Sequence, residues 1–160
     1  MVRLVIDASV ILKWFFDFPD EQNRDQALVL KNLHIEGKIV LIVPQYSIYE
    51  ITNALTFSKY KLDKAIVLES LAALEGLKIK RIDDYSDKKL MKMAVELAFE
   101  YSMTIYDALY LALANKLKCN LVTADRKFVD KLKKHEHSVH LLDQEFLNTE
   151  LADFVIERES

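Results

Sequence analysis

Short runs rich in β-branched residues alternate with longer helical patterns along the chain, and this alternation most constrains the fold. It is typical of α/β proteins with a mostly parallel sheet, because parallel strands need long crossover connections between them. We expect strands at residues 3–6, 39–43, 78–82, 120–123 and 138–141. We expect helices at residues 10–16, 21–36, 45–60, 63–74, 87–101, 104–118 and 126–134.

The chain has the size of one ordinary domain, with 160 residues and no repeat, low-complexity segment or linker. We assign residues 1–142 to the domain proper. The acidic stretch 143–160 carries Phe146, Leu147, Leu151, Phe154 and Val155 at near-helical spacing. It is expected to form a docked helical extension of the same domain.

Several classes of protein are disfavoured by composition. No apolar run approaches the roughly 18 residues that a membrane span requires. The N-terminal apolar run contains Asp7 and Lys13 and has no small-residue cleavage site, so we do not expect a signal peptide. The single cysteine, Cys119, cannot form an internal disulfide or a multi-cysteine zinc site. We therefore expect a cytoplasmic protein without membrane contact.

The scarcity of glycine excludes two nucleotide-binding motifs. Gly37 and Gly76 stand alone, whereas the dinucleotide fingerprint and the P-loop each need several closely spaced glycines. The net charge of −3 gives no general signal for nucleic acid, although Lys131, Lys133 and Lys134 could contact phosphates locally. Nucleotide-driven and nicotinamide chemistry are thus disfavoured.

Four acids are expected to meet at one edge of the sheet. Asp7 and Asp125 each follow a predicted strand, in "LVIDAS" and "NLVTAD". Glu50 and Asp107 lie near the start of helices whose N-termini belong at the same edge. The carboxyl ends of parallel strands share that edge, which is where open α/β sheets place ligands.

Each acid also has a simpler interpretation. Asp7 and Asp125 could cap the helices that follow them, because Asp is a preferred N-cap residue. Thr104 and Asp107 have nearly the spacing of a capping box, and Glu50 could lie on a solvated helix face. Four like charges at one edge, however, repel unless they are protonated or bridged by a cation.

A hard divalent cation would compensate such a cluster. Mg²⁺ or Mn²⁺, held by a few carboxylates and several waters, is the arrangement used with phosphate substrates. A carboxylate pair without metal could instead serve glycoside chemistry. Four acids at strand and helix ends favour the metal interpretation.

Three segments resemble the PIN-domain nucleases, and most closely their VapC-type toxins. These are "VIDASVILKWF", "PQYSIYEITNAL" and "YDALYLALANKLKCNLVTADRKF", in the family's order and spacing. The resemblance implies a three-layer α/β/α fold around a mostly parallel five-stranded sheet. It places the family's metal-binding acids on Asp7, Glu50, Asp107 and Asp125. It places polar residues that orient acids or waters on Ser9, Asn53 and Thr123, although local hydrogen bonds explain Ser9 and Thr123 equally well.

The function implied by this resemblance is a Mg²⁺- or Mn²⁺-dependent endoribonuclease. Such a toxin hydrolyses RNA with metal-activated water, is silenced by a small antitoxin protein and usually forms a homodimer. Three other functions stay open: a non-catalytic protein-binding module, a nuclease of RNA processing or DNA, and a phosphotransferase that uses a phospho-aspartate. The last normally needs a second Asp two residues after the first, where this chain has Ser9.

Aromatic and histidine residues near these motifs also have purely structural interpretations. We expect Trp14, Phe15 and Phe16 in the core. Tyr46, Tyr49 and Tyr106 could stack on unpaired bases, and Tyr110 is expected to pack in the core. The histidines of "HEHSVH" lack the spacing of a zinc-protease motif and are interpreted as solvated or strand-alternating; they are His135, His137 and His140.

Overall fold

The computed structural model describes residues 1–132 and 138–152. Within these residues a single five-stranded sheet has the order β3-β2-β1-β4-β5, and every neighbouring pair is parallel. The strands are β1 (Val2–Ile6), β2 (Ile39–Pro44), β3 (Lys80–Ile82), β4 (Asn120–Thr123) and β5 (Val139–Leu141). The predicted α/β fold with a mostly parallel sheet is confirmed, and all the predicted strands are present.

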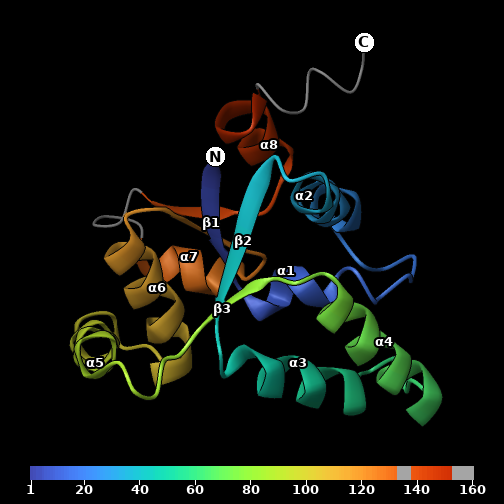
Figure 1. The fold of residues 1–160 in the computed structure, drawn as a ribbon, viewed down its shortest axis with the longest axis horizontal. Helices are drawn as coiled ribbons and strands as arrows, with labels where there is room; N and C mark the ends of the chain where they lie inside the picture. The colour runs from blue at the N-terminus through green and yellow to red at the C-terminus, as the bar shows by residue number, and fades with distance from the viewer. Residues whose placement is uncertain (133–137, 153–160) are drawn as a thin grey trace.

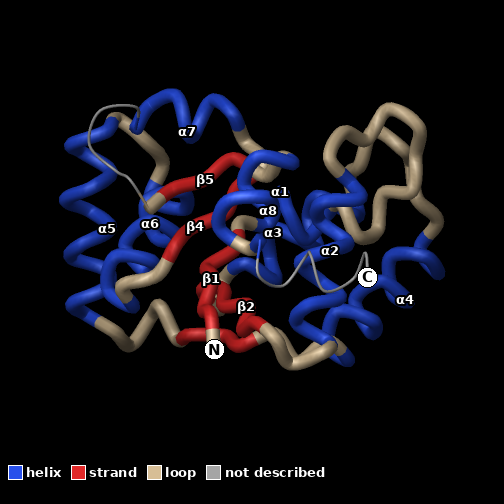
Figure 2. Tube along the Cα trace, turned by 90° about the horizontal axis from the view of Figure 1, so that it is seen from above, coloured by secondary structure: helices blue, strands red, loops and turns tan. Residues whose placement is uncertain are grey.

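Helices cover both faces of this sheet (Figures 1 and 2). They are α1 (Ala8–Leu12), α2 (Arg24–Ile35), α3 (Ser47–Thr56), α4 (Lys64–Gly76), α5 (Lys88–Tyr101), α6 (Ile105–Leu117), α7 (Arg126–Leu132) and α8 (Gln144–Glu150), among the described residues. Helix α6 packs on β1, β2 and β4, with α5 outside it, and α1 to α4 lie on the other face. The three-layer α/β/α arrangement is therefore confirmed.

The core explains why these segments fold as they do. Leu4, Val5 and Ile6 of β1 are fully buried, as expected for a central strand covered on both faces. Residues 108–114 of α6 are all buried, because this helix lies between the sheet and α5. All strands run in one direction, so their carboxyl ends share the edge at the bottom of Figure 1, where α3 begins.

Helix α1 ends earlier than the predicted helix 10–16. The structure ends α1 at Leu12. Trp14 and Phe16 are both buried, and the Trp14 indole N–H donates to the Ala27 carbonyl at 2.9 Å. A regular helix would place consecutive aromatic residues on different faces. The prediction that Trp14 and Phe16 belong to the core is confirmed, and Phe15 is partly buried against it.

The C-terminal extension docks through α8. The Asp143 carboxylate caps this helix by accepting from the Phe146 N–H at 2.9 Å, and Phe146, Leu147 and Leu151 are buried. The remainder of the predicted extension, and also Lys133, Lys134, His135 and His137, lie outside the described residues. No helix in residues 1–132 or 138–152 is long and apolar enough to cross a membrane.

Candidate acidic site at the carboxyl edge of the sheet

Asp7 stands where β1 ends and α1 begins. Its backbone N–H still pairs with the Val122 carbonyl at 3.0 Å, which fixes it beside β4. Its carboxylate caps α1 by accepting from the Ser9 N–H at 3.4 Å. The predicted helix cap is thus confirmed, but it uses only one of the two carboxylate oxygens, Oδ1.

The other Asp7 oxygen, Oδ2, is held by two hydroxyls. Thr123 Oγ1 donates to it at 2.6 Å and Ser9 Oγ donates at 2.9 Å. The same hydroxyls accept backbone N–H groups of the β4–α7 turn, from Ala124 to Ser9 Oγ at 3.0 Å and from Asp125 to Thr123 Oγ1 at 3.1 Å. One hydrogen-bond network therefore joins the ends of β1 and β4 and orients Asp7.

Glu50 projects from the first turn of α3 and is tied to α6 by Tyr110. The Tyr110 hydroxyl donates to Glu50 Oε2 at 2.8 Å and accepts from the Ala8 N–H at 3.3 Å. Burial raises the pKa of the Tyr110 phenol, so the phenol keeps its proton at neutral pH. Tyr110 is buried, as predicted, but it also connects Glu50 to the residue after Asp7; its place in the apolar face of α6 gave no sign of this contact.

Asp107 and Asp125 begin the helices on either side of β4. Asp107 is partly buried at the start of α6, where its N–H donates to the Thr104 hydroxyl at 3.1 Å. Asp125 is exposed, and its Oδ1 caps α7 by accepting from the N–H groups of Lys127 at 2.8 Å and Phe128 at 3.3 Å. The predicted Asp125 cap is therefore present, whereas the near-capping box at Thr104 is only half formed: Thr104 caps α6, but among the described residues the Thr104 N–H donates no bond to the Asp107 carboxylate.

The four acids share one electrostatic environment. Burial raises the pKa of Asp7, and the Asp107 charge adds to this rise although Thr123 and Ser9 oppose it. Burial raises the pKa of Glu50 to about 7, with further contributions from Asp7 and Asp107. Burial and the Asp125 charge raise the pKa of Asp107, while Lys131 lowers it. Charges on four separate elements therefore act on one another at this edge.

The donor set is suited to a hard divalent cation. It consists of carboxylate and hydroxyl oxygens, and burial, together with neighbouring acids, raises the pKa of three of its carboxyl groups. Within residues 1–132 and 138–152, however, no three His, Cys, Asp or Glu side chains form a ready group of metal ligands.

Of the other residues that the sequence indicated for the site, some contact this hydrogen-bond network and others do not. Ser9 and Thr123 touch Asp7, as described, whereas Asn53 is exposed on α3 and makes no side-chain hydrogen bond within the described part of the chain. The Tyr46 ring packs against Tyr110 with centroids 5.6 Å apart, and its hydroxyl donates to the Tyr106 carbonyl. Tyr49 and Tyr106 are largely exposed.

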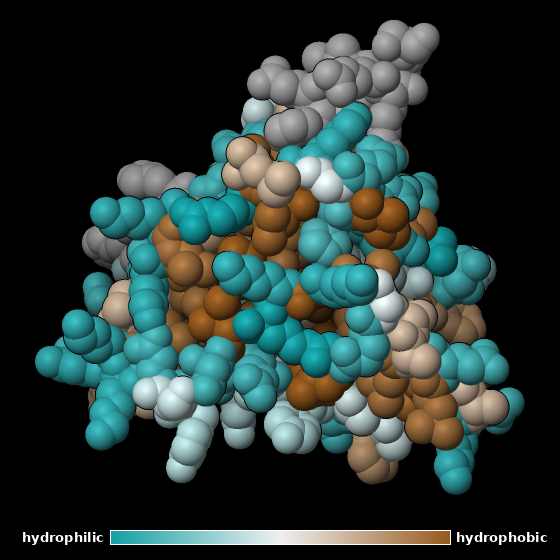
Figure 3. Space-filling model, viewed as in Figure 1, coloured by the Kyte–Doolittle hydropathy of each residue, from teal (hydrophilic) through white to brown (hydrophobic). Residues whose placement is uncertain are grey.

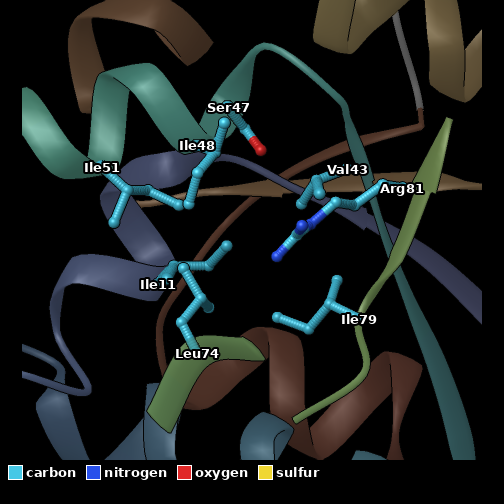
Figure 4. Close-up of a pocket in the computed structure, with 8 residues that line it drawn as sticks. All are labelled: Ile11, Val43, Ser47, Ile48, Ile51, Leu74, Ile79 and Arg81. Atoms are coloured by element: carbon cyan, nitrogen blue, oxygen red, sulfur yellow. The ribbon is translucent and has the colours of Figure 1, made fainter. Parts of the chain in front are cut away.

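A small apolar pocket lies behind α3 and is distinct from the acids. Figure 4 shows Ile11, Ile51 and Leu74 around it, with the Arg81 guanidinium reaching over the opening. Its walls carry no carboxylate. It is therefore a gap in the packing between α1, α3 and α4 and contributes no carboxylate to the acidic site.

Comparison with known proteins agrees with the fold. The family model for the PIN domain matches residues 4–134. Ribonuclease VapC3 of Pyrobaculum aerophilum is 29% identical over 135 residues, which cover 81% of this chain and 95% of that protein.

Solved structures of toxins share the architecture. The Mycobacterium tuberculosis VapC20, described as a sarcin–ricin loop cleaving toxin, is similar with a TM-score of 0.58 and 14% identity, over 79% of this chain and 93% of that one. A toxin–antitoxin complex from Klebsiella pneumoniae gives 0.57 and 16%, over 86% and 95%. With a family model that spans most of its length, this chain belongs to the PIN domain family.

Proposed function

We propose that this chain is a Mg²⁺- or Mn²⁺-dependent endoribonuclease and the toxin of a toxin–antitoxin pair. The observation that carries the proposal is the mutual electrostatic effect of acids from four separate elements at one sheet edge. Membership of the PIN domain family and the similarity to a VapC ribonuclease support the same activity.

Each acid has a distinct part in the proposed hydrolysis. Asp7, Asp107 and Asp125 would hold the cation, with Glu50 close by. When bound, the cation would lower the pKa of a coordinated water and stabilise the charge of an in-line displacement at phosphorus. Glu50, whose pKa is about 7, is suited to accept the proton of the attacking water, and Tyr110 fixes its orientation. Ser9 and Thr123 hold Asp7 in place.

The test is RNA cleavage by purified Asp7→Asn protein. We expect this variant to bind Mn²⁺ at least 10-fold more weakly by calorimetry and to leave single-stranded RNA uncut, because it loses a charged oxygen ligand. Asp20→Asn, a change of an acid outside the site, is the matched control and should cleave like the wild type. Wild-type cleavage by Asp7→Asn would refute the proposal, and absence of Mn²⁺ binding by the wild type would favour a non-catalytic binding module.

We propose an antitoxin as the protein partner, and an exposed apolar face of α3 and α4 supports it. Thr56, Leu62, Val67, Leu68 and Leu71 are among the residues that line a groove there. Figure 3 shows apolar atoms gathered at the lower right, in the part of the molecule where Figure 1 draws α4. Co-expression with a small neighbouring reading frame should yield a complex that purifies together and no longer cleaves RNA. The homodimer implied by the family resemblance stays a prediction, which sedimentation of the isolated chain would check.

A further inference from the structure

A second cavity opens at the same sheet edge, between the ends of β2 and β3. It has a volume of about 300 Å³. We name it the tyrosine pocket, and its walls are Gln45, Tyr46, Tyr49, Asp83, Asp84 and Tyr85. This volume is at the lower end of the range for small-molecule sites in proteins.

Hydrogen bonds between two strand-end turns preform the pocket. The Gln45 N–H donates to the Ile82 carbonyl at 2.8 Å, and the Tyr46 N–H donates to Asp84 Oδ1 at 3.0 Å. Asp83 Oδ1 in turn accepts the Tyr85 N–H at 3.0 Å, which fixes the turn that presents the Tyr85 ring. The backbone of both turns is therefore already fixed before a ligand binds.

Two walls of the tyrosine pocket are exposed aromatic rings. The exposed fractions are 77% for Tyr49 and 90% for Tyr85, far above those of the tyrosines in the core. Because both side chains are so exposed, burial of their rings contributes little to the stability of the fold. Aromatic faces stack readily on unpaired bases. The pocket thus offers stacking surfaces that the fold itself does not use.

The charge of the pocket selects for a base over a phosphate. Its walls include two carboxylates and no Lys or Arg, so a phosphate would be repelled. Asp84 is only 8% exposed, and its Oδ1 is committed to the Tyr46 N–H. Within the described residues its Oδ2 accepts no hydrogen bond, so it can accept from an amino group of a ligand.

Tyr46 connects this pocket with the acidic site. It lines the pocket on one side, and its ring packs against Tyr110, which hydrogen-bonds to Glu50. Its phenol also lies within the electrostatic influence of Glu50, Asp7 and Asp107. A ligand in the tyrosine pocket would therefore contact a residue that packs directly against the acidic site.

We propose that the tyrosine pocket binds one unpaired nucleobase of the RNA substrate, next to the bond that is cut. Tyr49 and Tyr85 stack on the base, and Asp84 accepts a hydrogen bond from its edge. Guanine is the preferred base, because its adjacent N–H and amino groups can donate to Oδ2 and to the second lone pair of Oδ1; uracil offers only a single N–H donor and is disfavoured. The inference rests on the proposed ribonuclease function.

The experiment measures RNA binding by fluorescence anisotropy in Ca²⁺, with RNA integrity checked afterwards on a gel. Three labelled RNA probes are compared: an oligouridylate, the same oligouridylate with one central guanosine, and the same oligouridylate with one central abasic residue. We expect Tyr85→Ala to weaken binding of the guanosine probe about 10-fold, since stacking on one base is lost. Phe99→Ala is the matched control, because Phe99 is 85% exposed on α5 and outside the pocket. For the abasic probe, Tyr85→Ala should bind like the wild type.

Asp84→Asn tests base selection separately. The variant retains the Oδ1 acceptor for the Tyr46 N–H but places an amide donor where Oδ2 was, so the guanosine preference over uridine should disappear. The inference is overturned if Tyr85→Ala binds like Phe99→Ala, or if its loss is the same on the abasic probe. Mn²⁺-dependent cleavage by the wild type is followed in parallel. If the wild type cleaves RNA but Tyr85→Ala does not weaken RNA binding, the pocket proposal alone is rejected. If Tyr85→Ala weakens RNA binding but the wild type does not cleave RNA, the ribonuclease proposal alone is rejected.

Discussion

Asp7 illustrates how one side chain can be a helix cap and a candidate metal ligand together. The cap and the ligand were alternatives at the level of sequence, because both follow from an acid after a strand. In the structure one carboxylate oxygen accepts the Ser9 N–H, and the other accepts the hydroxyls of Ser9 and Thr123. The cap fixes the backbone, and the hydroxyls fix the direction of the carboxylate.

Thr123→Val should weaken the site without unfolding the protein. Thr123 is fully buried in β4, and valine has nearly its shape and suits a strand. The variant loses the 2.6 Å bond to Asp7, so we expect Mn²⁺ affinity and RNA cleavage to fall about 10- to 100-fold. Thr149→Val, which removes a hydroxyl on α8, is the control. Equal activity of the two variants would show that Thr123 does not position Asp7.

Glu50→Gln should stabilise the metal-free protein at high pH. Glu50 has a pKa of about 7 in the folded state against a usual value of 4.5, so between these pH values only the folded state binds its proton. The stability of the wild type in EDTA therefore falls as pH rises from about 4.5 to about 7. Glutamine carries no such charge, so the melting temperature of the variant should exceed that of the wild type at about pH 8 and match it near pH 4.5. A difference that is independent of pH would contradict this assignment.

Among the elements, the segment after α1 departed most from expectation. Its helical pattern was extended to residue 16, but the chain turns at Lys13 so that Trp14 and Phe16 can enter the core. Lys13 itself is 8% exposed, and its Nζ donates to Glu21 Oε1 and to the Gln22 carbonyl, each at 2.6 Å. A buried lysine partnered by a distant loop cannot be inferred from periodicity, since exposed lysines have the same spacing.

Lys13→Met should cost about 2–4 kcal/mol of unfolding free energy. Methionine keeps the apolar stem but leaves Glu21, whose side chain is 16% exposed, without its cation. Lys59→Met is the matched control, because its pair with Asp20 is 66% and 60% exposed and is screened by solvent, so its loss should change stability far less. Urea denaturation of both variants measures the difference, and equal losses would mean that burial of the Lys13 pair is unimportant.

At the scale of the whole molecule, the direction of the strands was predictable but the tyrosine pocket was not. Alternating strands and helices indicated parallel pairing, and parallel pairing alone places Asp7, Glu50, Asp107 and Asp125 at one edge. The tyrosine pocket requires that β3 lie beside β2 and that Asp84 bond to Tyr46. Such contacts depend on strand order and side-chain packing between distant segments, and no local pattern encodes them.

Bound metal should stabilise the entire fold, since the candidate ligands come from four elements. We expect Mn²⁺ to raise the melting temperature and EDTA to reverse the rise. The rise should be larger at about pH 8 than at about pH 6, because metal competes with protons for carboxylates whose pKa values are raised. Asp7→Asn should remove most of it. An equal rise in this variant would place the stabilising metal elsewhere.

The central position of β1 determines when during synthesis the site can exist. β1 is translated first, yet one of its two neighbours, β4, begins only at Asn120. Until that strand has emerged and paired with β1, Asp7 has neither the Val122 carbonyl nor the Thr123 hydroxyl to hold it, and Asp125 cannot join it at the sheet edge. A product truncated before β4 would therefore lack the assembled acids and should leave RNA uncut.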